Sequence, residues 1–193
     1  MNGGEIALVG TIDLQWIPPN VYSLVIRETA LRGSLNLTAL PLSIQFLTFF
    51  SNEFSGEIDL CHLPAQIELL DLSYNKLTGS LSLEKLPQSI EKLYLEMNHF
   101  TGTVCLLHLP LSLQELSVGK NNLSGVVDLT RLPVNLNYLY LKGNNFEGKT
   151  DFRQLPEGLY HLDISYTNIS GEIAVGNRRT RFFVKYSKVQ LIQ

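Results

Sequence analysis

The sequence lacks the features that would place it in a membrane or on a nucleic acid. No apolar run approaches the roughly 18 to 20 residues of a transmembrane helix, and the start, MNGGEIALVG, lacks the basic and hydrophobic regions of a signal peptide. The 15 Lys and Arg nearly balance the 18 Asp and Glu, giving a net charge of −3, so overall charge selects no partner class. These absences predict a cytoplasmic protein without membrane insertion. A leader missing from this sequence would instead make it extracellular.

What the sequence does contain is a regular repeat. Prolines recur every 23 residues, at Pro18, Pro41, Pro64, Pro87, Pro110, Pro133 and Pro156. The sixth residue after each of these prolines is leucine, and the eighth is always apolar, with more variable residues on either side. Because strand side chains alternate between two faces, this pattern predicts one short strand per repeat.

Two further columns of the repeat indicate its corners. The fifteenth residue after each proline is glycine, from Gly33 to Gly171, and glycine permits a backbone bend that a side chain would obstruct. The eleventh residue is asparagine in the five inner repeats, flanked by Thr29 and Thr167 at the ends. Buried asparagine can bond to the backbone of its own turn and of the next one. We therefore expect an asparagine ladder that ends in threonine, where a neighbour is present on one side only.

Segments such as LPAQIELLDLSYNKLTGSLSL and LPQSIEKLYLEMNHFTGTVCL resemble the leucine-rich-repeat family in its LxxLxLxxNxxxG form. The resemblance covers roughly residues 8 to 175, and the LTG and FTG segments are similar to the repeat class common in plant and protozoan proteins. It implies an α/β-class leucine-rich-repeat solenoid, a right-handed horseshoe or superhelix with a parallel concave sheet. A repeat of about 23 residues leaves little room for an α-helix, so we expect a mostly β structure with short 3₁₀ turns.

The whole chain is predicted to be one leucine-rich-repeat domain, residues 1–193. Residues 1–17 form a partial N-terminal repeat, residues 18–177 form seven full repeats, and residues 178–193 form a C-terminal capping strand. Basic residues on that strand would blunt an edge able to pair with another chain. A basic binding patch is the alternative interpretation of the same residues, Arg178, Arg179, Arg181, Lys185 and Lys188.

The residues that could carry chemistry are scattered along the repeat. Cys61 and Cys105 lie two repeats apart, at about 10 Å or more for parallel stacking, too far for a disulfide bond. The histidines suggest no metal cluster. His161 and Asp163 could form a dyad, but the repeat places no nucleophile beside them. We expect no enzymatic activity, no cofactor and no metal.

Residues on either side of the strand leucines should face outward on the concave side. Apolar and aromatic side chains gather there, and exposed aromatic clusters are favoured interface anchors. The expected partner-binding residues are Phe46, Phe50, Leu69, Tyr94, Tyr138 and Tyr140.

Charges on this face alternate in sign and form no basic stripe, which favours a protein or peptide ligand over nucleic acid. We expect a monomeric protein-protein interaction module, that is, a scaffold without catalysis. The alternative is a structural or surface-antigen fragment of a longer secreted or anchored protein, for which the sequons at Asn36, Asn122 and Asn168 would be the sites to test.

Overall fold

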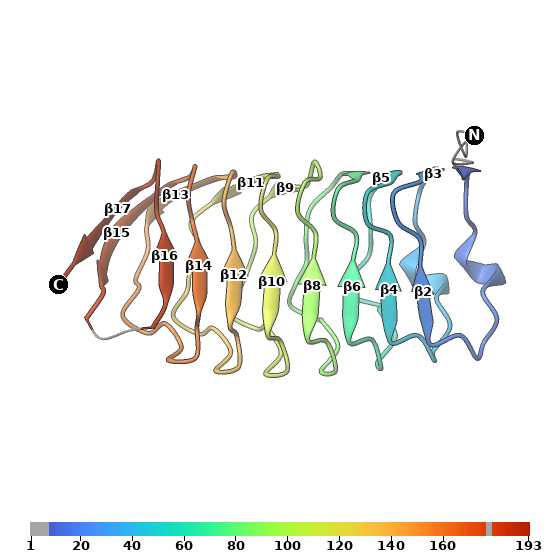
Figure 1. The fold of residues 1–193 in the computed structure, drawn as a ribbon, viewed down its shortest axis with the longest axis horizontal. Helices are drawn as coiled ribbons and strands as arrows, with labels where there is room; N and C mark the ends of the chain where they lie inside the picture. The colour runs from blue at the N-terminus through green and yellow to red at the C-terminus, as the bar shows by residue number, and fades with distance from the viewer. Residues whose placement is uncertain (1–7, 177–178) are drawn as a thin grey trace, which may run out of the picture.

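The computed structural model describes residues 8–176 and 179–193. The chain winds into a solenoid in which each full coil adds a three-residue strand to a parallel sheet, called here the main sheet (Figure 1). Among the described residues the main sheet has eight strands in sequence order: β2 (Ser23–Val25), β4 (Phe46–Thr48), β6 (Leu69–Asp71), β8 (Lys92–Tyr94), β10 (Glu115–Ser117), β12 (Tyr138–Tyr140), β14 (His161–Asp163) and β16 (Arg181–Phe183). The parallel, mostly β solenoid predicted from the repeat is confirmed.

The register of the main sheet follows the repeat. Leu47 pairs with Leu70, and Leu70 pairs with Leu93, so the strand leucines stack on one another from coil to coil. These leucines point into the core and are fully buried from Leu47 to Leu162, whereas Leu24 in the first strand is only partly buried. Because side chains alternate along a strand, the residues that flank each leucine point to the outer side of the main sheet, called here the sheet face.

The opposite side of the solenoid carries two shorter parallel sheets. The first contains β1 (Val9–Gly10), β3 (Ala30–Gly33), β5 (Glu53–Gly56) and β7 (Lys76–Leu77). The second contains β9 (Thr101–Gly102), β11 (Asn122–Gly125), β13 (Asn145–Lys149), β15 (Asn168–Ala174) and β17 (Lys188–Ile192). A single bridge between Ser80 and Thr101 links the coils where the first sheet gives way to the second.

Short 3₁₀ helices occur on the side away from the main sheet only in the first two coils of the described chain, η1 (Leu14–Trp16) and η2 (Leu37–Ala39). Asp13 and Asn36 cap these helices through their side-chain oxygens. In later coils, Asp128 and Asp151 each accept the backbone N–H two residues further on, at 2.9 Å. Such turns replace the 3₁₀ helix because the aspartate side chain offers the backbone an equivalent local bond.

The core contains an additional column with a period of two coils. Phe54, Phe100 and Phe146 are fully buried at the thirteenth residue after the proline, where the coils between them carry Leu77 and Leu123. Alternation of large and smaller side chains lets neighbouring coils interdigitate at close-packed density. Sequence analysis overlooked this column.

The asparagine ladder is present. Asn98 is buried, donates to the carbonyl oxygens of Leu72 at 3.0 Å and Leu95 at 3.2 Å, and accepts the N–H of Leu77 at 3.0 Å. At the N-terminal end the Thr29 hydroxyl instead donates to the side-chain oxygen of Asn52. At the other end the Thr167 hydroxyl donates to the Ile164 carbonyl at 2.7 Å. Threonine therefore takes over at both ends, as expected.

Each full coil turns through a left-handed residue just before the ladder position. The tenth residue after the proline has a φ between 51° and 62° in all seven coils, and only one of them is a glycine: Glu28, Ser51, Tyr74, Met97, Lys120, Gly143 and Tyr166. Backbone strain of this kind persists where surrounding contacts over-determine the conformation. Here the ladder bonds on either side hold it in place.

The last coil departs from the repeat. Leu162 pairs with Phe182, an offset of 20 residues instead of 23, and the chain then continues into β17 beside β15. The C-terminal segment thus forms two strands, where the sequence suggested a single capping strand. Arg179 and Arg181 are exposed there, whereas Arg178 lies outside the described residues.

Candidate binding site on the sheet face

The first group of expected binding residues lies at the N-terminal half of the sheet face. Phe46 of β4 and Leu69 of β6 are register partners, and both are half-buried. The ring of Phe50 lies 5.1 Å from the ring of Tyr74, measured between centroids. Tyr74 reaches Phe50 from the left-handed turn of the next coil. Phe46, Phe50, Leu69 and Tyr74 are called here the first apolar cluster.

A second group lies over β12, β14 and β16. The ring of His161 lies 4.6 Å from Tyr140 and 4.5 Å from Phe183, and Tyr138 lies 6.3 Å from His161. These four residues, Tyr138, Tyr140, His161 and Phe183, are called here the aromatic cluster. Such spacings are typical of favourable ring pairs.

Sequence reasoning placed Tyr138 and Tyr140 in the binding set but not His161 or Phe183. The column containing His161 was visible in the repeat. Phe183 was hidden because the last coil is three residues shorter than the others, which shifts it out of the proline-based numbering.

Tyr94 belongs to neither cluster. Its hydroxyl donates to Glu115 at 2.5 Å, and Lys92 pairs with the same carboxylate at 2.9 Å. Burial and this hydrogen bond raise the pKa of the Tyr94 phenol well above its usual value. The phenol therefore stays protonated, and its polar end is already engaged within the protein.

A polar belt separates the two clusters, formed by Asp71, Lys92, Tyr94, Glu96 and Glu115 on β6, β8, β10 and the residues that follow them. The belt contains three carboxylates and one ammonium group, which together carry a net charge of −2. Glu96 also accepts the hydroxyl of Ser117 at 2.8 Å. The belt favours a cationic group on any partner that covers it.

Among the described residues no hydrogen bond joins His161 and Asp163, the two residues that could form a dyad. The Asp163 carboxylate accepts the N–H and hydroxyl of Ser165 and lies 3.6 Å from the Lys142 ammonium. Nε2 of His161 is buried without a hydrogen-bond partner in the described part of the chain. Burial lowers the pKa of His161, so its imidazole is neutral at pH 7.

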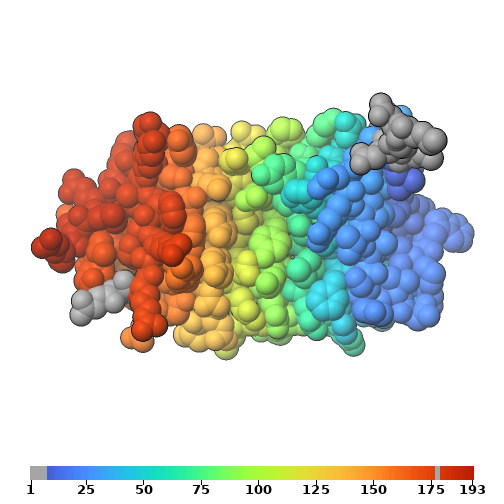
Figure 2. All heavy atoms as spheres, in the orientation of Figure 1, coloured from blue at the N-terminus to red at the C-terminus, as the bar shows by residue number. Residues whose placement is uncertain are grey.

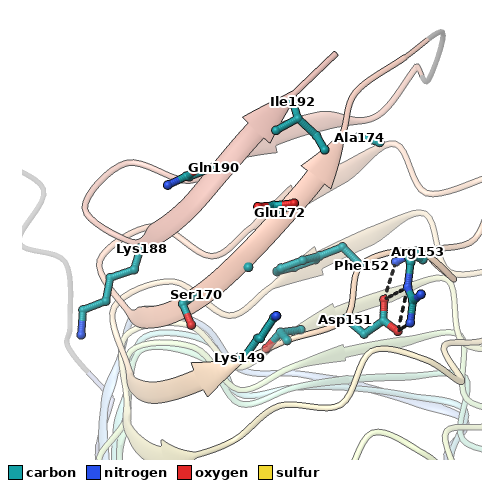
Figure 3. A pocket seen from close by; sticks show the side chains of 12 residues that line it. Lys149, Asp151, Phe152, Arg153, Ser170, Glu172, Ala174, Lys188, Gln190 and Ile192 are labelled. Atoms are coloured by element: carbon teal, nitrogen blue, oxygen red, sulfur yellow. Dashed lines mark hydrogen bonds and ion pairs between the residues drawn. The ribbon is translucent and has the colours of Figure 1, made fainter.

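The sheet face is broad and extends from the N-terminal to the C-terminal coils (Figure 2). A separate groove of about 1040 Å³ lies on the opposite side, between residues 149–153 and strands β15 and β17 (Figure 3). Asp151 and Arg153 pair at its rim, where hydrogen bonds from Arg153 lower the pKa of Asp151 to about 2. The groove contains none of the expected binding residues.

The sequence model of the leucine-rich-repeat family matches residues 66–86, a segment that spans β6 and β7, and the coils on both sides repeat its geometry. The chain is a leucine-rich-repeat protein. None of the helices found among the described residues of this leucine-rich-repeat protein has the length and hydrophobicity of a membrane span.

Solved leucine-rich-repeat structures share its fold. PEPR1, in the structure PEPR1-AtPEP1, is 28% identical with a TM-score of 0.66, over 81% of this chain and 24% of that chain. The Arabidopsis receptor kinase HAESA, solved with the peptide hormone IDA and the co-receptor SERK1, is 23% identical with a TM-score of 0.61, over 95% of this chain and 36% of that one. YopM from Yersinia enterocolitica is 27% identical with a TM-score of 0.52, over 92% of this chain and 44% of that chain.

This chain thus spans about a quarter to less than half of the length of these structures. No curated protein sequence matches it.

Proposed function

We propose that the sheet face binds an extended peptide, or an extended segment of a protein, through two apolar contacts separated by one cationic contact. The observation that carries this proposal is the division of one face into the first apolar cluster, the acidic belt and the aromatic cluster. The expected binding residues Phe46, Phe50, Leu69, Tyr138 and Tyr140 supply the two ends. Tyr94 contributes to the belt between them.

The spacing of the clusters sets the length of the ligand segment. Strands β6 and β12 are three strand spacings apart in the main sheet, which corresponds to about 14 Å. An extended chain rises about 3.3 Å per residue, so roughly four residues cover that distance. The ligand should therefore carry two aromatic or aliphatic residues about four positions apart, with Lys or Arg between them.

The solved structures support a ligand of this class. HAESA was solved with a peptide hormone, and it shares the fold of this chain. The repeats form a platform that is ordered before binding, which lowers the entropy cost of association. We propose that this platform acts as a monomer in binding, without catalysis and without a nucleic-acid partner.

A displayed library of random 12-residue peptides, selected on the purified chain, tests the proposal. Wild-type protein should enrich the apolar–cation–apolar pattern, and a Phe50→Ala, Tyr140→Ala double variant should not. Val134→Ala is the matched control, since Val134 is 70% exposed and lies at a turn outside the sheet face. Equal enrichment on the double variant would place binding elsewhere on the molecule.

We further propose that the protein acts in the cytoplasm, where Cys61 and Cys105, both free in the structure, stay reduced. Expression in the native cell followed by glycosidase treatment tests this location. A mass shift that is lost on replacing Asn36, Asn122 and Asn168 would show instead that the chain passes through the secretory pathway.

A further inference from the structure

The turns away from the main sheet bring a cysteine, a histidine and a glutamate together from two adjacent coils. Cys105 and His108 lie three residues apart on one turn, and Glu84 comes from the corresponding turn of the preceding coil. In the other full coils the position of Cys105 carries Asn36, Asp59, Ser82, Asp128, Asp151 or Ala174, none of which is a thiol. The thiol is thus a local departure from the repeat.

The ligand-forming atoms of these three side chains lie within 4.8 Å of one another. Sγ of Cys105 is 3.9 Å from Nδ1 of His108, and that nitrogen is 4.0 Å from Oε1 of Glu84. In a tetrahedral zinc site, bonds of about 2.0–2.3 Å place the ligand atoms about 3.3–3.8 Å apart. Movements of up to about 1 Å, within reach of side-chain rotation at exposed positions, would bring all three atoms to these separations.

We propose that Glu84, Cys105 and His108 form a binding site for a divalent transition metal of the zinc type. Thiolate, imidazole and carboxylate together are a donor set that suits zinc, whereas calcium and magnesium prefer oxygen ligands alone. Three protein ligands leave the fourth tetrahedral position to water. From the sequence no metal was expected, because the histidines were compared only with one another. Cys105 was not considered with His108, and Glu84 is brought close to both by coil stacking.

The same side of the chain supplies an internal control. Cys61 and His62 also lie on a turn away from the main sheet, close to Asp59. There, Nδ1 of His62 is held by the Asp59 carboxylate at 2.6 Å, while the Cys61 thiol donates to Ser82 of the next coil at 3.4 Å. The thiol and the imidazole are therefore directed to different partners. Within the described residues, no other three His, Cys, Asp or Glu side chains bring their ligand-forming atoms this close together.

A bound ion would join two coils in the middle of the solenoid. Since metal binds the folded chain in preference to the unfolded one, it raises the melting temperature. At an ion concentration 100-fold above the dissociation constant the rise should be about 5–10 °C. Because Glu84 and His108 are exposed and Cys105 is half-buried, substitutions at these positions should leave the fold intact.

Titration of the reduced full chain with Co²⁺, a spectroscopic probe for zinc sites, tests the proposal. The wild type should show one thiolate-to-cobalt absorption band, saturating at one ion per chain and displaced by Zn²⁺. Cys105→Ser should abolish the band, and His108→Ala and Glu84→Gln should weaken binding at least tenfold, whereas Cys61→Ser and His62→Ala should bind as the wild type does.

Calorimetry with Zn²⁺ and thermal unfolding provide readouts that do not depend on the cobalt spectrum. No saturable binding at 100 µM ion, or equal loss in the Cys61 and Cys105 variants, would overturn the proposal. If His108→Ala binds the ion as the wild type does, binding depends on the Cys105 thiol alone, and this result would overturn the proposal as well.

Discussion

Replacement of Asn98 by alanine tests the role of the ladder in holding the coils together. The Asn98 side chain makes three donated bonds and accepts the N–H of Leu77, and it is buried. Without the side chain, the buried N–H of Leu77 loses its partner, which costs about 1–3 kcal/mol. The carbonyls of Leu72 and Leu95 keep a second bond, from Asn75 and Asn121. Loss of the three donated bonds therefore adds about 0.5–1 kcal/mol each.

The expected loss for Asn98→Ala is therefore about 2.5–6 kcal/mol in the free energy of unfolding. Asn52→Ala is the matched control, because Asn52 makes the same type of donated bonds but accepts from the Thr29 hydroxyl. That hydroxyl is half-buried and can turn to water, so the loss should be only about 1–3 kcal/mol. Urea denaturation followed by circular dichroism and by fluorescence measures both, and two probes are needed because solenoids can unfold in parts. Equal losses of unfolding free energy in the two variants would show that the unpaired N–H of Leu77 does not account for the effect of Asn98→Ala.

Three further outcomes follow from the structure. Gly171→Ala should lower the free energy of unfolding by about 2–4 kcal/mol. The reason is that φ is +143° and an added Cβ would lie 2.6 Å from the carbonyl oxygen of Thr150. A loss below about 0.5 kcal/mol in urea denaturation would contradict this. Phe100→Ala should lower the free energy of unfolding by about 3–5 kcal/mol. Phe100→Leu should lower it markedly less, since Leu77 and Leu123 fill the same position in neighbouring coils. Thermal unfolding of both variants measures the difference. The pKa of His161 is lowered from 6.5, so the unfolded chain binds more protons and stability should fall as the pH drops below about 6.5. His161→Phe should lessen this dependence, and an unchanged pH profile would show that other groups cause it.

The periodic part of the structure could be predicted from the sequence because a single residue type repeats at one position. Leucine at the strand, asparagine at the ladder and glycine at the corner each satisfy a requirement that recurs in every coil, so the columns indicate the strands and turns directly. The outward placement of Phe46 and Tyr140 followed from the same alternation. These features depend only on local geometry and on stacking in register.

Other features depend on contacts that cannot be read from equivalent positions of the sequence repeat. The left-handed turn is occupied by residues as different as Glu28, Met97 and Lys120, because neighbouring ladder bonds impose it whatever the side chain. Phe183 reaches the sheet face only because the last coil is shortened. Glu84 meets His108 across a coil boundary at a position where the repeat varies freely. Tyr94 looked like an exposed anchor, but it is partly buried and its hydroxyl donates to Glu115. Burial and this hydrogen bond together raise its pKa.

The central claim is that the two clusters on the sheet face bind one ligand together. Isothermal titration of a selected peptide, performed on wild type, Phe50→Ala, Tyr140→Ala and Val134→Ala, tests it most directly. Truncation of a central anchor typically costs about 2 kcal/mol or more, roughly 30-fold in the dissociation constant. Our account predicts such a loss for each cluster variant and none for Val134→Ala. Unchanged affinity in both cluster variants would show that the peptide binds elsewhere and would contradict the proposed function.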